Sequence, residues 1–248
     1  MSTTPPPSRV DRTVRWGLND ATVGIALAVV FAWAASWAAA RGWPALPELR
    51  LALSFLATAV PLLGVVLFAS FVRGRRSLIR DFGLRFAWID LFFGLVVGGM
   101  MRAATTLVEI VIYGRVASGA GTFGPIVSDA WWLVFTIVVA VLTVPLVEEL
   151  FFRGLMQRSL VRASIASASP AVAGTRIPVV IAISVTALVF AALHMLQTAG
   201  GLEMIVVGLS TLVLGVGTGV LAATTGRLGA AIIAHITYNG LVVAWALL

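Results

Sequence analysis

The feature that most constrains the fold of this chain is a series of long apolar segments. A transmembrane helix needs about 20 consecutive, mostly apolar residues. Seven segments meet this criterion, at residues 22–40, 51–72, 88–112, 131–152, 178–196, 203–223 and 229–247. They predict an all-α fold, a polytopic transmembrane bundle of about seven spanning helices.

The composition supports this class of protein. Of the 248 residues, 60% are hydrophobic and only 11% are charged, whereas soluble domains carry roughly 25% charged residues. A single soluble core cannot bury this excess of apolar surface. The polar, proline-rich residues 1–19 are expected to form a disordered cytoplasmic tail, and residues 20–248 a single transmembrane domain. The absence of cysteine excludes thiolate catalysis.

The distribution of the basic residues predicts the orientation. All 17 are arginine, and they lie between the apolar segments, as topology determinants do, and not in one stripe that would bind nucleic acid. If the N-terminus is inside, the inner side holds 13 of them and the outer side only Arg41, Arg50 and Arg115, with Arg102 inside a span. Because short cytoplasmic loops are enriched in arginine, this count favours an N-in, C-out topology.

Several ionisable side chains fall inside the apolar segments, where a charge is costly and marks a candidate functional site. Five of these residues are the main candidates: Glu148, Glu149, Arg153, His194 and His235. Three more lie near or within the third segment: Asp90, Arg102 and Glu109. The chain has only two histidines, and both fall in predicted spans.

The spacing of the glutamates predicts different roles for them. Glu149 and Arg153 are four residues apart, so on a helix they share a face and can pair. Glu148 points about 100° away, toward another neighbour. The alternative is that both carboxylates lie at a helix end and are solvated by water at the headgroups.

The histidines also have partners at helical spacing. Phe190 and His194 are four residues apart, as are His235 and Asn239. A lone histidine on an apolar face is often a packed, hydrogen-bonded residue. Two histidines, an amide and a carboxylate on separate helices must instead satisfy one another or line a wet cavity.

This set of side chains fits two chemistries. A carboxylate and a histidine can activate water as a general base, while a second histidine and an amide hydrogen-bond a developing oxyanion. The same two imidazoles and carboxylate, Glu148, His194 and His235, would also be a zinc-binding set. The HExxH motif of helical zinc proteases is absent.

Three motifs in this order resemble a known family. They are EELFFR (Glu148 to Arg153), FAALH (Phe190 to His194) and HITYN (His235 to Asn239). They resemble the EExxxR, FxxxH and HxxxN pattern of the CPBP family, which comprises type II CAAX prenyl endopeptidases and bacteriocin-processing proteins. The resemblance covers about the last 100 residues, a catalytic core at about 131–248, whereas the first 130 match only in hydrophobicity.

The resemblance implies an intramembrane endopeptidase that cleaves membrane-associated proteins or peptides. Glu148 would activate the water with help from His194, and His235 with Asn239 would stabilise the oxyanion. The resemblance implies supporting roles for Glu149, Arg153 and Phe190. The family is often labelled a metalloprotease, but a metal-free mechanism has also been proposed for it, and we favour the latter, with zinc as the alternative.

Further expectations concern location and competing functions. We expect a multi-pass protein of a bacterial plasma membrane, with a membrane-associated peptide or protein as substrate and no nucleic-acid partner. The inner-side bias of Arg153, Arg158 and Arg162 suggests a site open to the cytoplasm. The alternatives are a catalytically idle scaffold or regulator, and a proton-coupled transporter that uses the intramembrane Glu and His as a relay.

A shared site requires one particular geometry. Glu148 lies 17 residues past Trp131 and His194 lies 16 past Pro178, so helices that start at opposite bilayer faces would place them at different depths. They can meet if the fourth helix continues past Arg153, or if the fifth begins above the bilayer. The Glu148 carboxylate should then lie within about 11 Å, two helical turns, of His194.

Overall fold

The computed structural model describes residues 14–43, 47–116, 130–198 and 200–247. Within these ranges every regular element is a helix, and no strand occurs. The elements are α1 (Leu18–Ala40), α2 (Pro47–Phe71), α3 (Leu78–Phe82), α4 (Trp88–Tyr113), α6 (Ala130–Phe135), η1 (Thr136–Thr143), α7 (Val144–Glu149), η2 (Leu150–Gln157), α8 (Arg158–Ser167), α9 (Pro170–Ala173), α10 (Ile177–Met195), α11 (Gly201–Thr225) and α12 (Gly229–Ala246).

Seven of the helices are long and apolar enough to cross a membrane, as predicted. Their outer surfaces carry many exposed large apolar side chains, which suit contact with lipid. The chain is therefore a multi-pass membrane protein. Residues 1–13 of the expected tail lie outside the described residues, and the division at residue 20 stays a prediction.

The fourth span differs from its predicted range of 131–152. It is one continuous segment of helical turns from Ala130 to Ser167, formed by α6, η1, α7, η2 and α8. The polar residues Arg153, Gln157 and Arg158 end the hydropathic run but do not end the helix, because all three are good helix formers. The fourth helix thus continues past Arg153, one of the two arrangements that a shared site requires.

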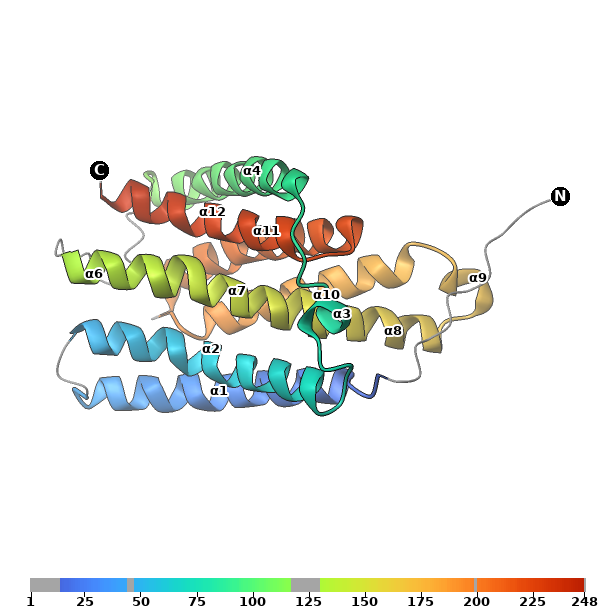
Figure 1. The fold of residues 1–248 in the computed structure, drawn as a ribbon. Coiled ribbons are helices and arrows are strands. Elements are labelled where there is room, and N and C mark those ends of the chain that lie inside the picture. The colour runs from blue at the N-terminus through green and yellow to red at the C-terminus, as the bar shows by residue number, and fades with distance from the viewer. Residues whose placement is uncertain (1–13, 44–46, 117–129, 199, 248) are drawn as a thin grey trace.

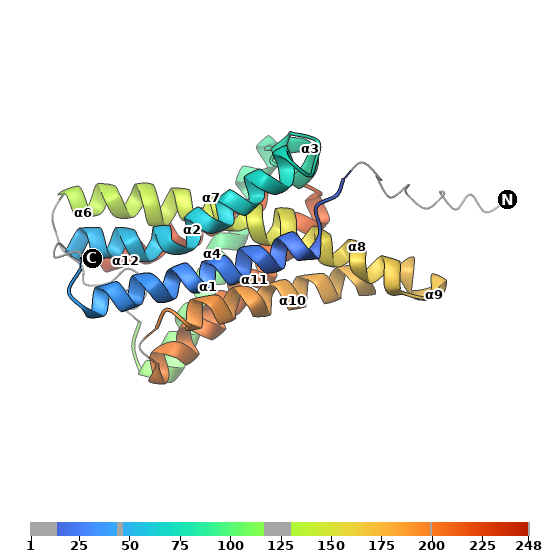
Figure 2. The same ribbon diagram turned by 90° about the horizontal axis from the view of Figure 1, so that it is seen from below.

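The other spans pack around this central segment in pairs. α1 packs against α2, α10 against α11, and α4 against α12, while the central segment contacts α2, α10 and α12 (Figures 1 and 2). The α4–α12 contact is close because α4 carries glycine there. A Cβ atom at Gly98 would lie 2.6 Å from the carbonyl oxygen of Ala234 in α12, so glycine is needed for this approach.

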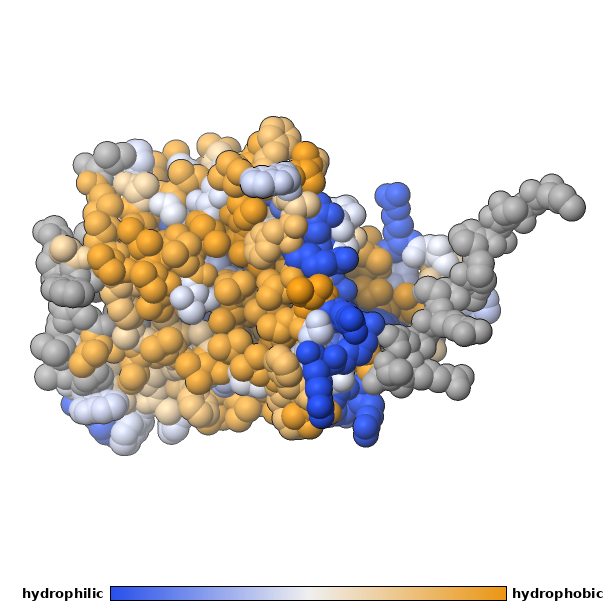
Figure 3. All heavy atoms as spheres, in the orientation of Figure 1, coloured by the Kyte–Doolittle hydropathy of each residue, from blue (hydrophilic) through white to orange (hydrophobic). Residues whose placement is uncertain are grey.

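One end of the bundle is rich in arginine. Figure 3 shows it as a hydrophilic band beside the apolar body. Ion pairs join the elements there, with Arg73 on Asp20 at 3.0 Å and Arg227 on Asp90 at 2.7 Å. Asp90, singled out above as an intramembrane charge, is thus a partner of the α11–α12 turn. Beyond this end, α8, α9 and the start of α10 project past the other helices (Figures 1 and 2).

Candidate active site

The two glutamates occupy one turn of α-helix between two π-helical stretches. α7 ends at Glu149, and η1 and η2 flank it on either side. π-helical turns are rare, and they occur frequently at functional sites. Each adds a residue to the turn and so rotates the following side chains relative to a regular α-helix. Glu148 and Glu149 are both buried, with exposed fractions of 6% and 0%.

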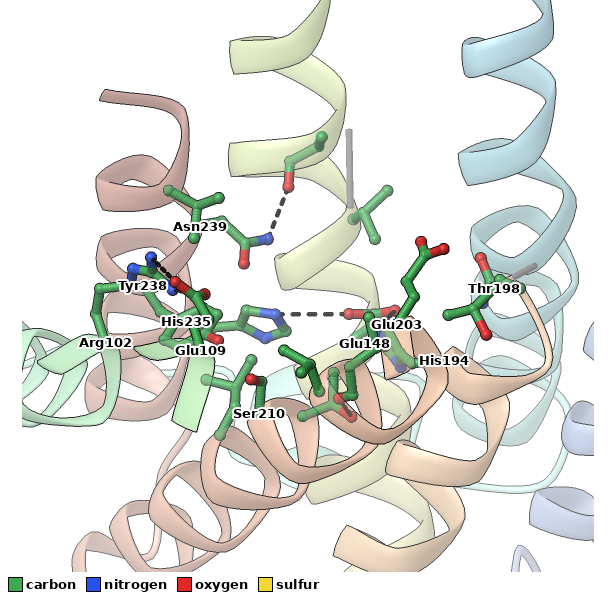
Figure 4. A pocket seen from close by; sticks show the side chains of 18 of the residues that line it. Arg102, Glu109, Glu148, His194, Thr198, Glu203, Ser210, His235, Tyr238 and Asn239 are labelled. Atoms are coloured by element: carbon green, nitrogen blue, oxygen red, sulfur yellow. Dashed lines mark hydrogen bonds and ion pairs between the residues drawn. The ribbon is translucent and has the colours of Figure 1, made fainter. Parts of the chain in front are cut away.

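The Glu148 carboxylate lies between the two imidazoles of the chain (Figure 4). Its Oε1 is 3.7 Å from Nε2 of His194, and its Oε2 is 3.7 Å from Nε2 of His235. The separation from His194 is well inside the limit of about 11 Å expected for a shared site. Both distances exceed the length of a direct hydrogen bond. The three side chains therefore meet from α7, α10 and α12 without direct hydrogen bonds between them.

The other ring nitrogen of each histidine is already engaged. Nδ1 of His194 lies 2.9 Å from the Phe190 carbonyl oxygen, and Nδ1 of His235 lies 2.9 Å from Oε1 of Glu149. A carbonyl oxygen and a carboxylate only accept, so each Nδ1 carries the hydrogen. In the neutral rings both Nε2 atoms are then acceptors that face the Glu148 carboxylate. Three acceptor groups meet, so a donor such as a water molecule or a shared proton is needed between them.

Glu149 forms the supporting cluster that its spacing predicts. Its Oε1 lies 3.1 Å from Nη1 of Arg153, four residues on. Arg153 is 1% exposed, donates from Nη2 to the Gly215 carbonyl oxygen of α11 at 3.1 Å, and lies over the Phe190 ring at 4.8 Å. The spacing did not predict the second contact of Glu149, with His235. Through it, the supporting carboxylate orients one of the imidazoles beside Glu148.

Asn239 lies one turn beyond His235 and contacts the central segment. Its Nδ2 donates to the Ala140 carbonyl oxygen in η1 at 3.0 Å. The Val144 N–H bonds to the Val139 carbonyl five residues back, so in this register residue 145 would donate to Ala140. Residue 145 is proline and has no N–H. Asn239 therefore satisfies a carbonyl that Pro145 leaves free, and its second N–H remains available.

A cavity of about 510 Å³ extends from these residues. Its wall includes Glu148, His194, His235 and Asn239, together with a buried ion pair in which Arg102 donates to Glu109 at 2.6 and 3.0 Å. Figure 4 shows this pair and Tyr238 on one side of the cavity, and Thr198 and Glu203 on the other. Sequence reasoning flagged Arg102 and Glu109 but missed other lining polar residues: Thr58, Tyr113, Gln197, Thr198, Glu203, Ser210, Thr211 and Tyr238. The spacing of Glu203, Ser210 and Thr211 along one face of the sixth segment could have found three of them.

A bound zinc ion needs three or four side-chain donors around one point. Among the described residues, no group of three or more His, Cys, Asp or Glu side chains is arranged to hold a metal ion. Nδ1 of each histidine is engaged with another acceptor, so only the Nε2 atoms face Glu148. Metal-binding histidines also donate their other ring nitrogen to a carbonyl or carboxylate oxygen, so zinc held by Glu148, His194 and His235 stays a prediction.

These features define a class of protein: a polytopic helical membrane protein with a buried carboxylate and two imidazoles beside an internal cavity. Residues 130–241 match the family model described as type II CAAX prenyl endopeptidase Rce1-like. This segment contains the three motifs, so the family recognised from them is confirmed over that range. No curated protein and no solved structure matches the chain.

Proposed function

We propose that this chain is an intramembrane endopeptidase in which Glu148 activates a water molecule for attack on a peptide bond. The observation that carries the proposal is the placement of the Glu148 carboxylate 3.7 Å from Nε2 of both histidines, with each Nδ1 engaged elsewhere. A water molecule beside Glu148 would donate one hydrogen to the carboxylate.

The steps follow from these side chains. Glu148, assisted by His194, accepts a proton from the water as its oxygen attacks the carbonyl carbon of the substrate. The carbonyl oxygen becomes an oxyanion, which accepts hydrogen bonds from the second N–H of Asn239 and, when the proton shared between Glu148 and the imidazoles lies on Nε2 of His235, from that nitrogen. Glu149 is the counter-charge for that imidazolium. When the C–N bond breaks, Glu148 returns its proton to the leaving amine, which restores the site.

The substrate class follows in part from the family. A CAAX-type protease acts on a membrane-embedded substrate, and the apolar part of the cavity wall, with Phe55, Val206 and Leu214, suits an apolar segment. The buried Arg102–Glu109 pair is neutral as a whole, so it presents hydrogen-bonding groups to a peptide backbone without a net charge. We propose a metal-free reaction and a location in a bacterial plasma membrane.

The adjacent carboxylates provide a matched test. Glu148→Gln keeps the shape of the side chain but removes the base, so turnover should fall by at least about 10²-fold with the stability unchanged. Glu149→Gln leaves Arg153 buried without its counter-charge, which should cost about 3–5 kcal/mol of stability as well as activity. Turnover is measured in proteoliposomes with a library of membrane-anchored peptides, by mass spectrometry of new peptide termini, and stability by thermal unfolding in detergent.

The outcomes separate the proposal from its rivals. If Glu148→Gln forms the same products as the unsubstituted chain, Glu148 is not the base and the proposed mechanism fails. Metal analysis of the same purified samples, with and without a chelator, tests the metal-free reaction. Stoichiometric zinc that is lost together with turnover would contradict it.

A further inference from the structure

The cavity extends from the site in one direction only. Its wall includes Phe55 and Thr58 of α2 and His194 of α10, and most of its other lining residues come from four spanning helices. On the central segment it is lined by Ala140, Val144 and Glu148, and on α12 by His235, Tyr238, Asn239 and Val242. On α11 the lining residues fall between Glu203 and Leu214, in its first half, and on α4 between Arg102 and Tyr113, in its second half. In every case these are the parts of the helices that lie farther from the arginine-rich end. The cavity therefore runs from Glu148 toward the arginine-poor end.

The space between the site and the arginine-rich end is filled by packed side chains. Phe152 and Phe190 stack edge to face with their centroids 4.9 Å apart, and both are at most 1% exposed. Two residues after Phe152, a Cβ atom at Gly154 would lie 2.8 Å from Cβ of Phe82 in α3. The fully buried side chains Phe82, Phe151, Leu155 and Leu228 complete this layer. No lining residue of the cavity comes from it, which contradicts the expectation that the site opens on the side of Arg158 and Arg162.

The far end of the cavity has the chemistry of an entrance. Arg115 and Gln197 are exposed there, Glu203 and Tyr113 are partly exposed, and all four line the cavity. His194, on that side of the site, has 25% of its side chain exposed, against 2% for His235. The entrance is thus polar, and apolar residues such as Val206, Val207 and Val242 line the path beyond it.

The arginines indicate which compartment this entrance faces. Arg102 lies within α4 and Arg153 lies in the site. Of the other 15 arginines, 12 belong to the tail and to the loops and helix ends of one side, and three to the other. The arginine-rich end is therefore assigned to the cytoplasm. We infer that the substrate enters from the arginine-poor side, and that the substrates are polypeptide segments on the extracytoplasmic side of the membrane or in its outer leaflet. This inference rests on the proposed endopeptidase function and names its substrate class.

The lack of cysteine allows a direct test with single cysteines along one face of α11. Glu203→Cys marks the entrance, Ser210→Cys the cavity, and Thr218→Cys the packed half, where Thr218 is fully buried. Ala171→Cys, on the exposed α9, marks the arginine-rich end. Each full-length variant is treated with a charged, membrane-impermeant methanethiosulfonate in intact cells and in inverted membrane vesicles.

The expected pattern is asymmetric. Cysteines at 203 and 210 should be modified in intact cells, the cysteine at 171 only in inverted vesicles, and the cysteine at 218 in neither. Modification at 210 only in inverted vesicles would overturn the inference, because the cavity would then open to the cytoplasm. Modification at 203 and 171 from the same side would also overturn it. If Ser210→Cys does not fold, Val207→Cys, which lines the same cavity, takes its place.

This labelling needs no turnover, so it fails independently of the proposed function. If the cysteine at 210 is modified from outside and the Glu148→Gln variant still processes peptides normally, the access route stands and the catalytic role of Glu148 is refuted. If the Glu148→Gln variant loses processing but the cysteine at 210 is modified only from inside, the endopeptidase proposal stands and the proposed substrate class is refuted. A final arm uses two anchored reporter peptides with the same apolar segment on opposite sides of the membrane. Only the external one should be cut.

Discussion

Glu148 and Glu149 are identical side chains at adjacent positions, and their surroundings differ. Glu149 is fully buried and is engaged by Arg153 and by Nδ1 of His235. Glu148 lies at the cavity wall, and neither imidazole nitrogen is within hydrogen-bond distance of its oxygens. A carboxylate held by two donors cannot readily exchange a proton, whereas one beside a cavity can. The difference in role therefore comes from the rotation of about 100° between successive helical residues.

Asn239 combines a structural hydrogen bond with a proposed catalytic one, and a double-mutant cycle can separate them. Asn239→Ala should destabilise the fold by about 1 kcal/mol because the Ala140 carbonyl loses its donor, and should reduce turnover about 10²–10³-fold. Pro145→Ala restores a backbone N–H that can satisfy the same carbonyl.

In the double variant the stability cost of Asn239→Ala should shrink, while the turnover stays low. Unfolding in detergent and peptide turnover are measured for all four proteins of the cycle. Recovery of turnover together with stability would mean that Asn239 acts only on the helix and donates nothing to the reaction.

At this scale the sequence predicted part of the site. The Glu149–Arg153 pair follows from a spacing of four, and it is present at 3.1 Å. The contact of His235 with Glu149 and the place of Tyr238 beside the Arg102–Glu109 pair did not follow. They depend on how α12 and α4 are rotated against the central segment, and a spacing within one helix carries no information about that rotation.

The central segment is the element that determines the geometry of the site. Its length from Ala130 to Ser167 places Glu148 away from both ends, so the carboxylate can reach His194 of α10 at the same level. Hydropathy alone predicted that this span ends near Phe152, because Arg153 and Gln157 are polar. In the structure both are buried and donate to carbonyl oxygens of α11, at Gly215 and Gly219. The π-helical turns could not be predicted from apolar periodicity either, since they shift it by only one residue.

The short helix α3 provides a pH-dependent element outside the membrane spans. Burial of Asp81 by itself favours the neutral acid, but hydrogen bonds from the Ser70 hydroxyl and from Arg75 hold the pKa of Asp81 below its usual value. The carboxylate therefore stabilises α3 above its unfolded pKa of about 3.9, and this stabilisation is lost as the pH falls through the lower folded value.

We thus expect residues 70–83 to become less protected from hydrogen exchange as the pH is lowered from 6 to 3, after correction for the intrinsic exchange rate. Asp81→Asn should remove this pH dependence, since an amide does not titrate. An unchanged pH profile in Asp81→Asn would assign the effect to another group of the arginine-rich end.

For the whole molecule, the number of spans could be predicted from sequence and the position of the cavity could not. Seven segments of about 20 apolar residues suffice for the number because the bilayer imposes that length. The cavity depends on which half of each helix is packed, and both halves of α11 are apolar in sequence. The packed layer with Phe82, Phe152 and Phe190 joins α3, the central segment and α10, residues that are far apart in the chain.

The projecting α8–α10 connection allows the two parts of the site to be separated covalently. Glu148 precedes this connection, and both histidines follow it. α9 has no buried residue, and helices in a bilayer are held together by packing between them once each has formed. A site-specific protease sequence inserted after Gly174 and then cut should therefore leave two fragments that co-purify and retain most of the turnover.

An insertion after Gly226 is the matched control. There the backbone is engaged, since the Gly226 carbonyl accepts from Arg158 and the Leu228 N–H donates to the Gly83 carbonyl at 2.9 Å. That variant should lose stability even before it is cut, as thermal unfolding in detergent would measure. Co-elution in size-exclusion chromatography and turnover of the anchored peptides test the cut protein. The Gly174 fragments could separate, or they could stay together and lose turnover. Either result would show that the α8–α10 connection contributes to the site. The active unit could not then be confined to the membrane-embedded bundle.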